Sequence, residues 1–305
     1  MTPSFGLIIV GDEILSGKRA DKHLPKVIEL LGARGLQLAY ADYVGDDPAR
    51  ITATLARAFA AARKNGDVVF SCGGIGATPD DHTRQCAAKA LGVELALHPT
   101  AKTLILERMA DVAKEQGTPY EPDRDDNIHR LNMGVFPVGA EIIPNPYNKI
   151  PGFSCFVEHS SDSTSRGTGF AGPQATAPSG GRELHAVSDR GGVHFLPGFP
   201  VMAWPMIEWA LDNHYAHLHQ KSSYTEKSVI IFGSMEAMLT PVMLDIEAAH
   251  AGVKVFSLPS VDHPEYGRHI ELGVKGAPEA VNLAYPAMLA GLHKFDLKFG
   301  PELVR

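Results

Sequence analysis

One stretch of this chain, residues 68–83, constrains the fold more than any other. It begins with an apolar run at 68–70, continues through a turn with three glycines, and ends in a pattern typical of a helix start. A strand, a turn and a helix in succession form the repeating unit of sheets whose parallel strands are joined by helices. The glycines, which permit positive φ angles and a close approach of a ligand to the main chain, are Gly73, Gly74 and Gly76.

The residues that follow these glycines indicate a phosphate site that includes a metal ion. Free amides at a helix start favour an anion, yet the adjacent carboxylates of Asp80 and Asp81 would repel a bare phosphate. A divalent cation resolves this conflict by bridging carboxylate and phosphate oxygens. Thr78 and Thr83 are candidate hydroxyl donors to the phosphate, and equally candidates for local capping. The alternative interpretation is a plain strand-to-helix turn capped by an aspartate.

Two common glycine motifs do not fit this stretch. A P-loop ends in Gly-Lys-Ser or Gly-Lys-Thr, where this chain has Pro79-Asp80. The dinucleotide-binding motif requires a third glycine at the position that Pro79 occupies. Neither of these two motifs therefore accounts for the glycine turn.

The composition is that of an ordinary globular protein. The chain has 305 residues, of which 44% are hydrophobic and 21% charged, and this length suffices for two domains. A net charge of −7 disfavours a nucleic-acid-binding surface. Three cysteines without a C-x-x-C pair fit a reducing compartment, and no segment reads as a signal peptide or membrane span. We therefore expect a cytoplasmic protein that binds neither nucleic acid nor membrane.

Strands alternate with helices along most of the chain. Strands are expected at 6–10, 36–40, 67–72, 140–143 and 193–196, and helices at 21–34, 48–62, 83–91, 100–115, 127–133 and 202–218. This alternation predicts a three-layer α/β/α domain around a doubly wound, mostly parallel sheet. Ligands bind such sheets beyond the carboxyl ends of the strands. We therefore expect the segments 11–13 and 46–47 to share one rim with the glycine turn.

The pattern changes after about residue 225. It predicts a strand at 228–232, a helix at 238–250, strands at 253–258 and 268–274, and a helix at 277–292. This β-α-β-β-α order suits a small α+β domain. The predicted organisation is an α/β domain at residues 1–220, with a flexible insertion rich in small and polar residues at 159–182, followed by the small domain at 225–305.

Four separated segments resemble motifs of the molybdopterin-binding domain, of MoaB/Mog type, in the competence/damage-inducible protein family. They are Gly-Asp-Glu-Ile-Leu-Ser-Gly at 11–17, the glycine turn at 73–83, the stretch 127–153 that ends in Pro-Gly-Phe, and Leu-Pro-Gly-Phe-Pro at 196–200. Their order and spacing match apart from the insertion, and residues 225–295 resemble the small domain that follows in that family. The deamidase domain that often follows has no counterpart here, so deamidation of a nicotinamide nucleotide is not expected.

The resemblance implies that the chain binds molybdopterin or a related phosphorylated pterin or nucleotide, with magnesium or another divalent cation. The adenylyl-transfer branch uses aspartates at the positions of Asp46 and Asp81, which are therefore the candidate catalytic and metal-binding residues. The candidate ligand-binding residues are Glu13, Gly73, Gly74, Gly76, Thr78, Asp80, Thr83, Asn145, Asn148, Pro151 and Gly152.

Three functions remain open at this point. The first is a molybdopterin-binding protein of molybdenum cofactor metabolism, with adenylyl transfer as its reaction. The second is a metal-dependent nucleotide pyrophosphatase that cleaves compounds such as ADP-ribose or FAD. The third is a non-catalytic relative, which is favoured by Lys149 at a place where the family usually has a small residue. The small C-terminal domain is a candidate for pairing copies into a homo-oligomer.

Overall fold

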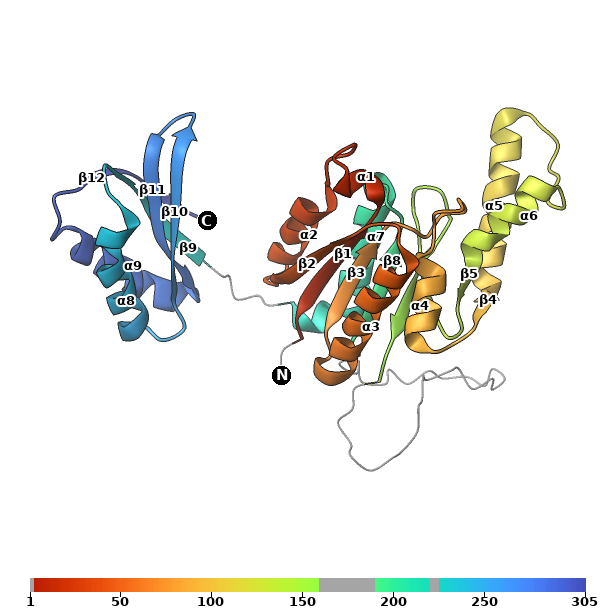
Figure 1. Cartoon of the computed structure of the whole chain (residues 1–305), viewed down its shortest axis with the longest axis horizontal. Helices are drawn as coiled ribbons and strands as arrows, with labels where there is room; N and C mark the ends of the chain where they lie inside the picture. The colour runs from red at the N-terminus through yellow and green to blue at the C-terminus, as the bar shows by residue number, and fades with distance from the viewer. Residues whose placement is uncertain (1–2, 159–189, 220–224) are drawn as a thin grey trace, which may run out of the picture. The chain divides into compact units, whose positions relative to one another are not determined.

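The computed structural model describes residues 3–158, 190–219 and 225–305. The chain divides into two compact units, Met1–His219 and Gln220–Arg305, and both are drawn in Figure 1. The insertion predicted at 159–182 lies outside the described residues. No helix in the described part of the chain is long and apolar enough to cross a membrane.

A six-stranded sheet forms the centre of the first unit, in the order β2-β1-β3-β8-β7-β6. Its strands are β1 (Phe5–Val10), β2 (Leu38–Val44), β3 (Val68–Cys72), β6 (Glu141–Ile143), β7 (Gly152–Phe156) and β8 (Gly192–Leu196). β2, β1, β3 and β8 are mutually parallel, whereas β7 runs antiparallel to both β8 and β6. The predicted doubly wound, mostly parallel sheet is therefore confirmed.

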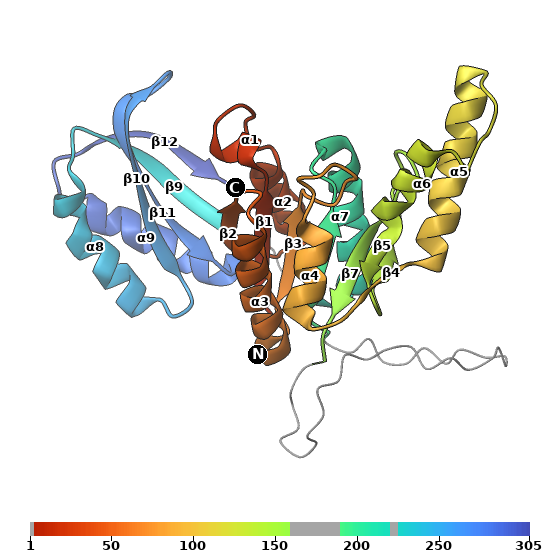
Figure 2. The ribbon, with the colours of Figure 1, turned by 45° about the vertical axis from the view of Figure 1, so that its right-hand side comes forward.

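Helices cover both faces of this sheet, as Figures 1 and 2 show. α3 (Pro48–Asn65) and α4 (Thr83–Leu91) pack on one face, and α2 (His23–Gly32) and α7 (Pro200–His214) on the other. Along β1, Leu7 and Ile9 join the core beneath α2 and α7, while Ile8 and Val10 join the core beneath α3 and α4. This two-residue alternation explains why a strand covered on both faces is apolar throughout.

An arm projects from the same unit beyond α4 (Figure 2). It consists of β4 (Leu95–Leu97), α5 (Pro99–Gln116), α6 (Asp125–Leu131), the 3-10 helix η1 (Asn132–Gly134) and β5 (Val135–Pro137). β4 and β5 pair antiparallel. The sequence pattern predicts neither strand, since β5 contains Pro137 and β4 contains Ala96, residue types that are depleted in strands.

The second unit holds a four-stranded antiparallel sheet in the order β10-β11-β9-β12. Its elements are β9 (Thr225–Phe232), α8 (Glu236–Ala249), β10 (Lys254–His263), β11 (Gly267–Gly276), α9 (Pro278–Leu292) and β12 (Lys298–Val304). The predicted order lacks β12, whose centre contains Gly300 and Pro301, residues that are rare in strands. β12 tolerates them because it is an edge strand whose register shifts between Phe299 and Glu302.

A buried histidine network lies between β7, β8 and the end of α7. The Nδ1 atom of His194 lies 2.8 Å from the Ser154 hydroxyl, and its Nε2 atom lies 2.7 Å from the Tyr215 hydroxyl. All three side chains are buried. Burial, with a smaller contribution from neighbouring His214, lowers the pKa of His194 to about 3.

This histidine should make the stability of the first unit depend on pH. An unfolded histidine has a pKa of about 6.5, so the unfolded chain binds a proton before the folded chain does. The free energy of unfolding should fall by up to about 1.4 kcal/mol per pH unit below about pH 6.5, and His194→Gln should remove this contribution. Urea unfolding of both proteins across that range measures the slope. A difference between them that stays constant with pH would contradict the prediction.

Candidate functional site

The segments that follow β1 and β2 are joined at the carboxyl end of the sheet, where β1 leads directly into the short helix α1 (Asp12–Leu15). The Asp12 amide donates to Oδ2 of Asp46 at 2.9 Å, and the Asp46 amide donates to Oδ1 of Asp12 at 3.1 Å. The next loop along the rim follows β3, where the Gly73 amide donates to the Leu196 carbonyl at the end of β8. The predicted rim of segments 11–13, 46–47 and the glycine turn is therefore present.

Negative charge is concentrated on this rim around Asp46. Partial burial is the largest cause that raises the pKa of Asp46, and the charges of Asp12, Glu13 and Asp80 raise it further. Only the hydrogen bond from the Asp12 amide opposes them. The described residues hold no set of three or more Asp, Glu, His or Cys side chains already arranged around a metal. The rim therefore has the negative charge to attract a cation, but its described side chains do not form a complete metal-binding site.

The glycine turn after β3 has a conformation that only glycine adopts without strain. Gly73 has a φ of 108° and Gly74 a φ of 69°. A Cβ atom on Gly73 would lie 2.2 Å from the Val10 carbonyl oxygen. A Cβ atom on Gly74 would lie 2.2 Å from the Thr83 hydroxyl. The backbone of this turn therefore packs directly against β1 and the start of α4.

Four consecutive amides of the turn, from Gly74 to Ala77, donate to no group in the described part of the chain. The amides on either side of this run do have acceptors. The Gly73 amide donates to the Leu196 carbonyl, and the Thr78 amide donates to Oδ2 of Asp81 at 2.8 Å. Successive unpaired amides in a turn form a concavity that binds anions. The N-terminus of α4, a nine-residue helix, follows closely and adds to the attraction.

Asp81 folds back over this turn. Its Oδ2 atom accepts hydrogen bonds from the Thr78 amide at 2.8 Å and from the Thr78 hydroxyl at 2.5 Å. Within the described residues, Oδ1 accepts no hydrogen bond. Asp80 is exposed, and the nearby Thr78 hydroxyl is the main cause that lowers its pKa. Gly76 lies so close that a Cβ atom there would be 2.5 Å from Oδ2 of Asp81.

Thr83 supports the turn from inside the protein. Its side chain is fully buried. The hydroxyl donates to the Gly73 carbonyl at 3.1 Å, and the Thr83 amide donates to the Gly74 carbonyl at 3.0 Å. In this structure the Thr83 hydroxyl therefore ties the glycine turn to the first residue of α4.

Asn145 and Asn148 hold the loop between β6 and β7 together. The side-chain amide of buried Asn145 donates to Oδ1 of Asn148 at 2.8 Å and to the Ile150 carbonyl at 2.9 Å. Gly152, predicted to belong to this loop, is instead the first residue of β7, where a Cβ atom would lie 2.4 Å from the Phe195 carbonyl. Within the described residues, no hydrogen bond links this loop to the glycine turn.

Two further residues of that loop differ in exposure, since Pro151 is buried and Lys149 is exposed. Lys149 has a positive φ of 65° and directs its ammonium group to Asp111 of α5 at 2.6 Å, with Glu107 at 3.7 Å. These carboxylates raise the pKa of Lys149, with Asp111 as the main cause. The cation that departs from the family pattern is therefore engaged by the arm.

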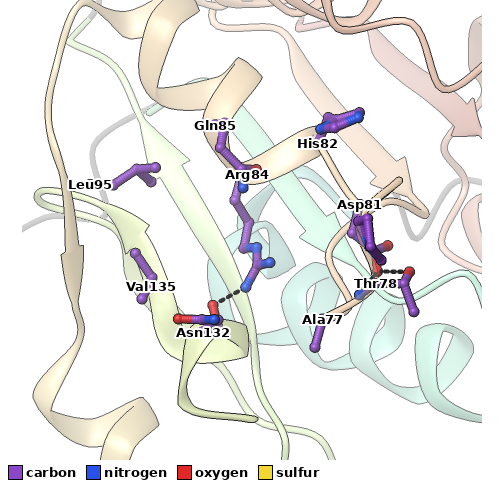
Figure 3. A pocket seen from close by; sticks show the side chains of 10 residues that line it. Ala77, Thr78, Asp81, His82, Arg84, Gln85, Leu95, Asn132 and Val135 are labelled. Carbon is purple, nitrogen blue, oxygen red and sulfur yellow. Dashed lines mark hydrogen bonds between the residues drawn. The ribbon is translucent and has the colours of Figure 1, made fainter. Parts of the chain in front are cut away.

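A pocket of about 430 Å³ opens between the glycine turn and the arm. Figure 3 shows Asp81 and Thr78 on one side of it, Asn132 and Val135 on the other, and Arg84 reaching from α4 across to Asn132. Arg84 is not among the residues that the sequence predicts for the site. The sequence did contain a signal for Arg84. A cation in the first turn of a helix interacts unfavourably with the helix dipole, so its presence there indicates another role.

Comparisons with known proteins show the family of the first unit. A family model described as "probable molybdopterin binding domain" matches residues 6–217. CinA-like proteins of Mycobacterium tuberculosis are 26% identical over 254 residues, and one of Anaeromyxobacter dehalogenans is 28% identical over 251. Each alignment covers 81% of this chain and 50% of the relative. The chain thus spans about half the length of these curated relatives.

Solved structures include more distant matches. The protein CinA from Thermoplasma acidophilum, whose function is described as unknown, is 23% identical and matches with a TM-score of 0.47. That match covers 69% of this chain and 98% of the other. The molybdopterin biosynthesis enzyme MoaB from Thermus thermophilus is 17% identical, with a TM-score of 0.36 and coverage of 70% and 94%.

Proposed function

Because the chain belongs to the family of probable molybdopterin-binding domains, we propose that its first unit binds molybdopterin or a closely related phosphorylated pterin. The role is one in molybdenum cofactor metabolism. The observation that carries this proposal is the run of four open amides from Gly74 to Ala77 beside the N-terminus of α4. Phosphate oxygens are the natural acceptors for such amides.

We propose that Mg²⁺ bridges the bound phosphate and the acidic rim. Carboxylate oxygens are suitable ligands for this ion, and Asp81 keeps Oδ1 available while Thr78 holds Oδ2. Burial is the main cause that raises the pKa of Asp46, and a cation would offset the repulsion from Asp12, Glu13 and Asp80 that adds to it. Asp46 and Asp81 are therefore the proposed metal ligands, and the groups that would position a reacting phosphate if turnover occurs.

The remaining predicted residues divide into two proposed roles. Residues on the rim that are exposed or partly exposed are proposed to contact the ligand or its metal, and Thr78 is placed among them although it also donates to Asp81. Residues that are buried or bonded within their own loops are proposed to hold the site's backbone in place. The first group is Glu13, Gly74, Gly76, Thr78 and Asp80, and the second is Gly73, Thr83, Asn145, Asn148, Pro151 and Gly152.

Ligand-dependent thermal stability tests the proposal. The melting temperature is measured with molybdopterin, with ATP and with neither, each with and without Mg²⁺. A ligand present at about 100 times its Kd stabilises the folded protein by about 2.7 kcal/mol, enough for a shift of several degrees. We expect a shift with molybdopterin that grows with Mg²⁺. A folded protein that shows no shift with any phosphorylated pterin would exclude this function.

The acidic rim favours a second candidate, a metal-dependent nucleotide pyrophosphatase. The charges of Asp12, Glu13 and Asp80 all act on Asp46, and such a concentration of carboxylates offers ligands to the metal ions that assist hydrolysis. Incubation with ADP-ribose, FAD or NAD and Mg²⁺, Mn²⁺ or Co²⁺ would release AMP in this case. If AMP does not form with any of these metals, the candidate is discarded, and ligand binding without turnover would indicate a non-catalytic relative.

A further inference from the structure

Arg84 is a buried cation whose guanidinium lies within the electrostatic influence of Asp81 but not in direct contact with it. Only 4% of the residue is exposed, and in the described part of the chain it forms no ion pair. Its Nη2 atom donates to the Gly76 carbonyl at 2.6 Å, and its Nη1 atom donates to the Asn132 carbonyl. Its Nε atom is buried without a hydrogen-bond partner among the described residues. Burial lowers the pKa of Arg84 more than the charge of Asp81 raises it, so keeping a charge at this place is costly and needs an explanation.

The bond to Gly76 fixes one peptide plane of the glycine turn. In a trans peptide the N–H of the next residue points opposite to the carbonyl. No peptide bond in the described structure is cis. Because the Gly76 carbonyl points toward Arg84, the Ala77 amide points away from it. Ala77 lines the pocket and is one of the four residues with an open amide.

The bond to Asn132 connects the turn to the arm. Asn132 begins η1 and lies 48 residues from Arg84 in the sequence. A guanidinium can bind two separate carbonyls at once because it presents five donors in a rigid plane, whereas a lysine ammonium is a single point. Arg84 therefore sets the position of both walls of the pocket with one side chain.

We propose that Arg84 is the positioning residue that keeps the glycine turn open to an anion. It turns the Gly76 carbonyl inward and the Ala77 amide outward, and it places a positive charge behind the amides. This inference rests on the proposed phosphate site. Arg84 acts through the Ala77 amide, and no direct contact with ligand is required.

Two variants of Arg84 and one matched control test this role. Arg84→Lys keeps the charge but cannot span both carbonyls, and Arg84→Ala removes the side chain. Arg57→Ala is the control, because Arg57 is an exposed arginine on α3 whose guanidinium lies beside surface Asp42 and Thr54. The Kd for inorganic pyrophosphate with Mg²⁺ is measured by calorimetry below the melting temperature of each protein.

We expect Arg84→Lys to weaken pyrophosphate binding by at least ~10-fold, and Arg84→Ala by more, with Arg57→Ala unchanged. Added guanidinium ion should restore binding to Arg84→Ala, whereas sodium chloride at equal ionic strength should not. Amide hydrogen exchange in residues 74–77 of the free protein should differ between wild type and Arg84→Lys. A role in stability alone would lower the melting temperature without guanidinium rescue, and would overturn the inference.

The two measurements separate failure of this inference from failure of the proposed function. If wild-type protein binds pyrophosphate and Arg84→Lys binds it equally well, the positioning role is wrong while the phosphate site stands. If wild-type protein binds neither pyrophosphate nor molybdopterin, the proposed function fails. In that case hydrogen exchange still tests the role of Arg84, because it is measured on the free protein. Unchanged exchange at residues 74–77 in Arg84→Lys would overturn the positioning role.

Discussion

Replacing Gly73 by alanine should cost the first unit about 3–5 kcal/mol of stability, one of the largest effects expected from a single methyl group. The φ angle of 108° is unfavourable for any residue with a Cβ atom. In addition, the new Cβ would lie 2.2 Å from the Val10 carbonyl oxygen, a backbone atom of the central strand β1. A side chain could rotate away from such a contact, but the backbone of a six-stranded sheet cannot. Urea unfolding measures the loss.

Two other glycines separate the causes of this effect. Gly17 has a φ of 71°, and a Cβ atom there would have no neighbour within 4 Å, so Gly17→Ala should cost only the backbone strain, about 1–2 kcal/mol. Gly32, the last residue of α2, has neither positive φ nor a close neighbour, so Gly32→Ala should stabilise by about 0.5–1 kcal/mol. If Gly73→Ala lost no more stability than Gly17→Ala, the backbone at Val10 would be able to move away from the new Cβ atom, and the predicted clash would be wrong.

Replacing Asp81 by asparagine should remove function while the fold survives. The variant loses the negative charge that we propose for the metal, and metal-dependent ligand binding should weaken on the order of 100-fold. Its side-chain oxygen can still accept hydrogen bonds from Thr78, so the free energy of unfolding should change by no more than about 1 kcal/mol. Titration with molybdopterin, with and without Mg²⁺, measures the effect.

Asp123→Asn provides the matched control for charge. Asp123 is an aspartate of the arm, between α5 and α6. Its replacement should alter neither binding nor stability. Binding by Asp81→Asn that equals wild type at every Mg²⁺ concentration would remove Asp81 from the metal site, and would leave the amides as the only support for phosphate binding.

Much of the site could be predicted from the sequence because its main features are local. The apolar run of β3 and the three glycines after it identify a strand and a turn open to a ligand. Asp47 next to Pro48 predicts a helix start, and the Asp47 side chain does cap α3 by accepting from the Arg50 amide at 2.8 Å.

Other features depended on contacts that no local pattern encodes. Thr83 could be read equally as a ligand or as a cap, and its burial against Gly73 places its hydroxyl inside the turn. The sequence predicts a loop where β7 begins, because Pro151-Gly152 is a pair typical of turns. The pairing of β7 with both β6 and β8 outweighs that local signal.

The sequence by itself determined the glycine turn and every strand of the central sheet except β7, because apolar periodicity and the freedom of glycine act within a few residues. The tertiary structure decided which polar groups meet. Asp12 and Asp46 are 34 residues apart, and Arg84 and Asn132 are 48 apart. These pairs form only after the chain has packed, because packing is what brings segments so far apart in the sequence within hydrogen-bonding distance.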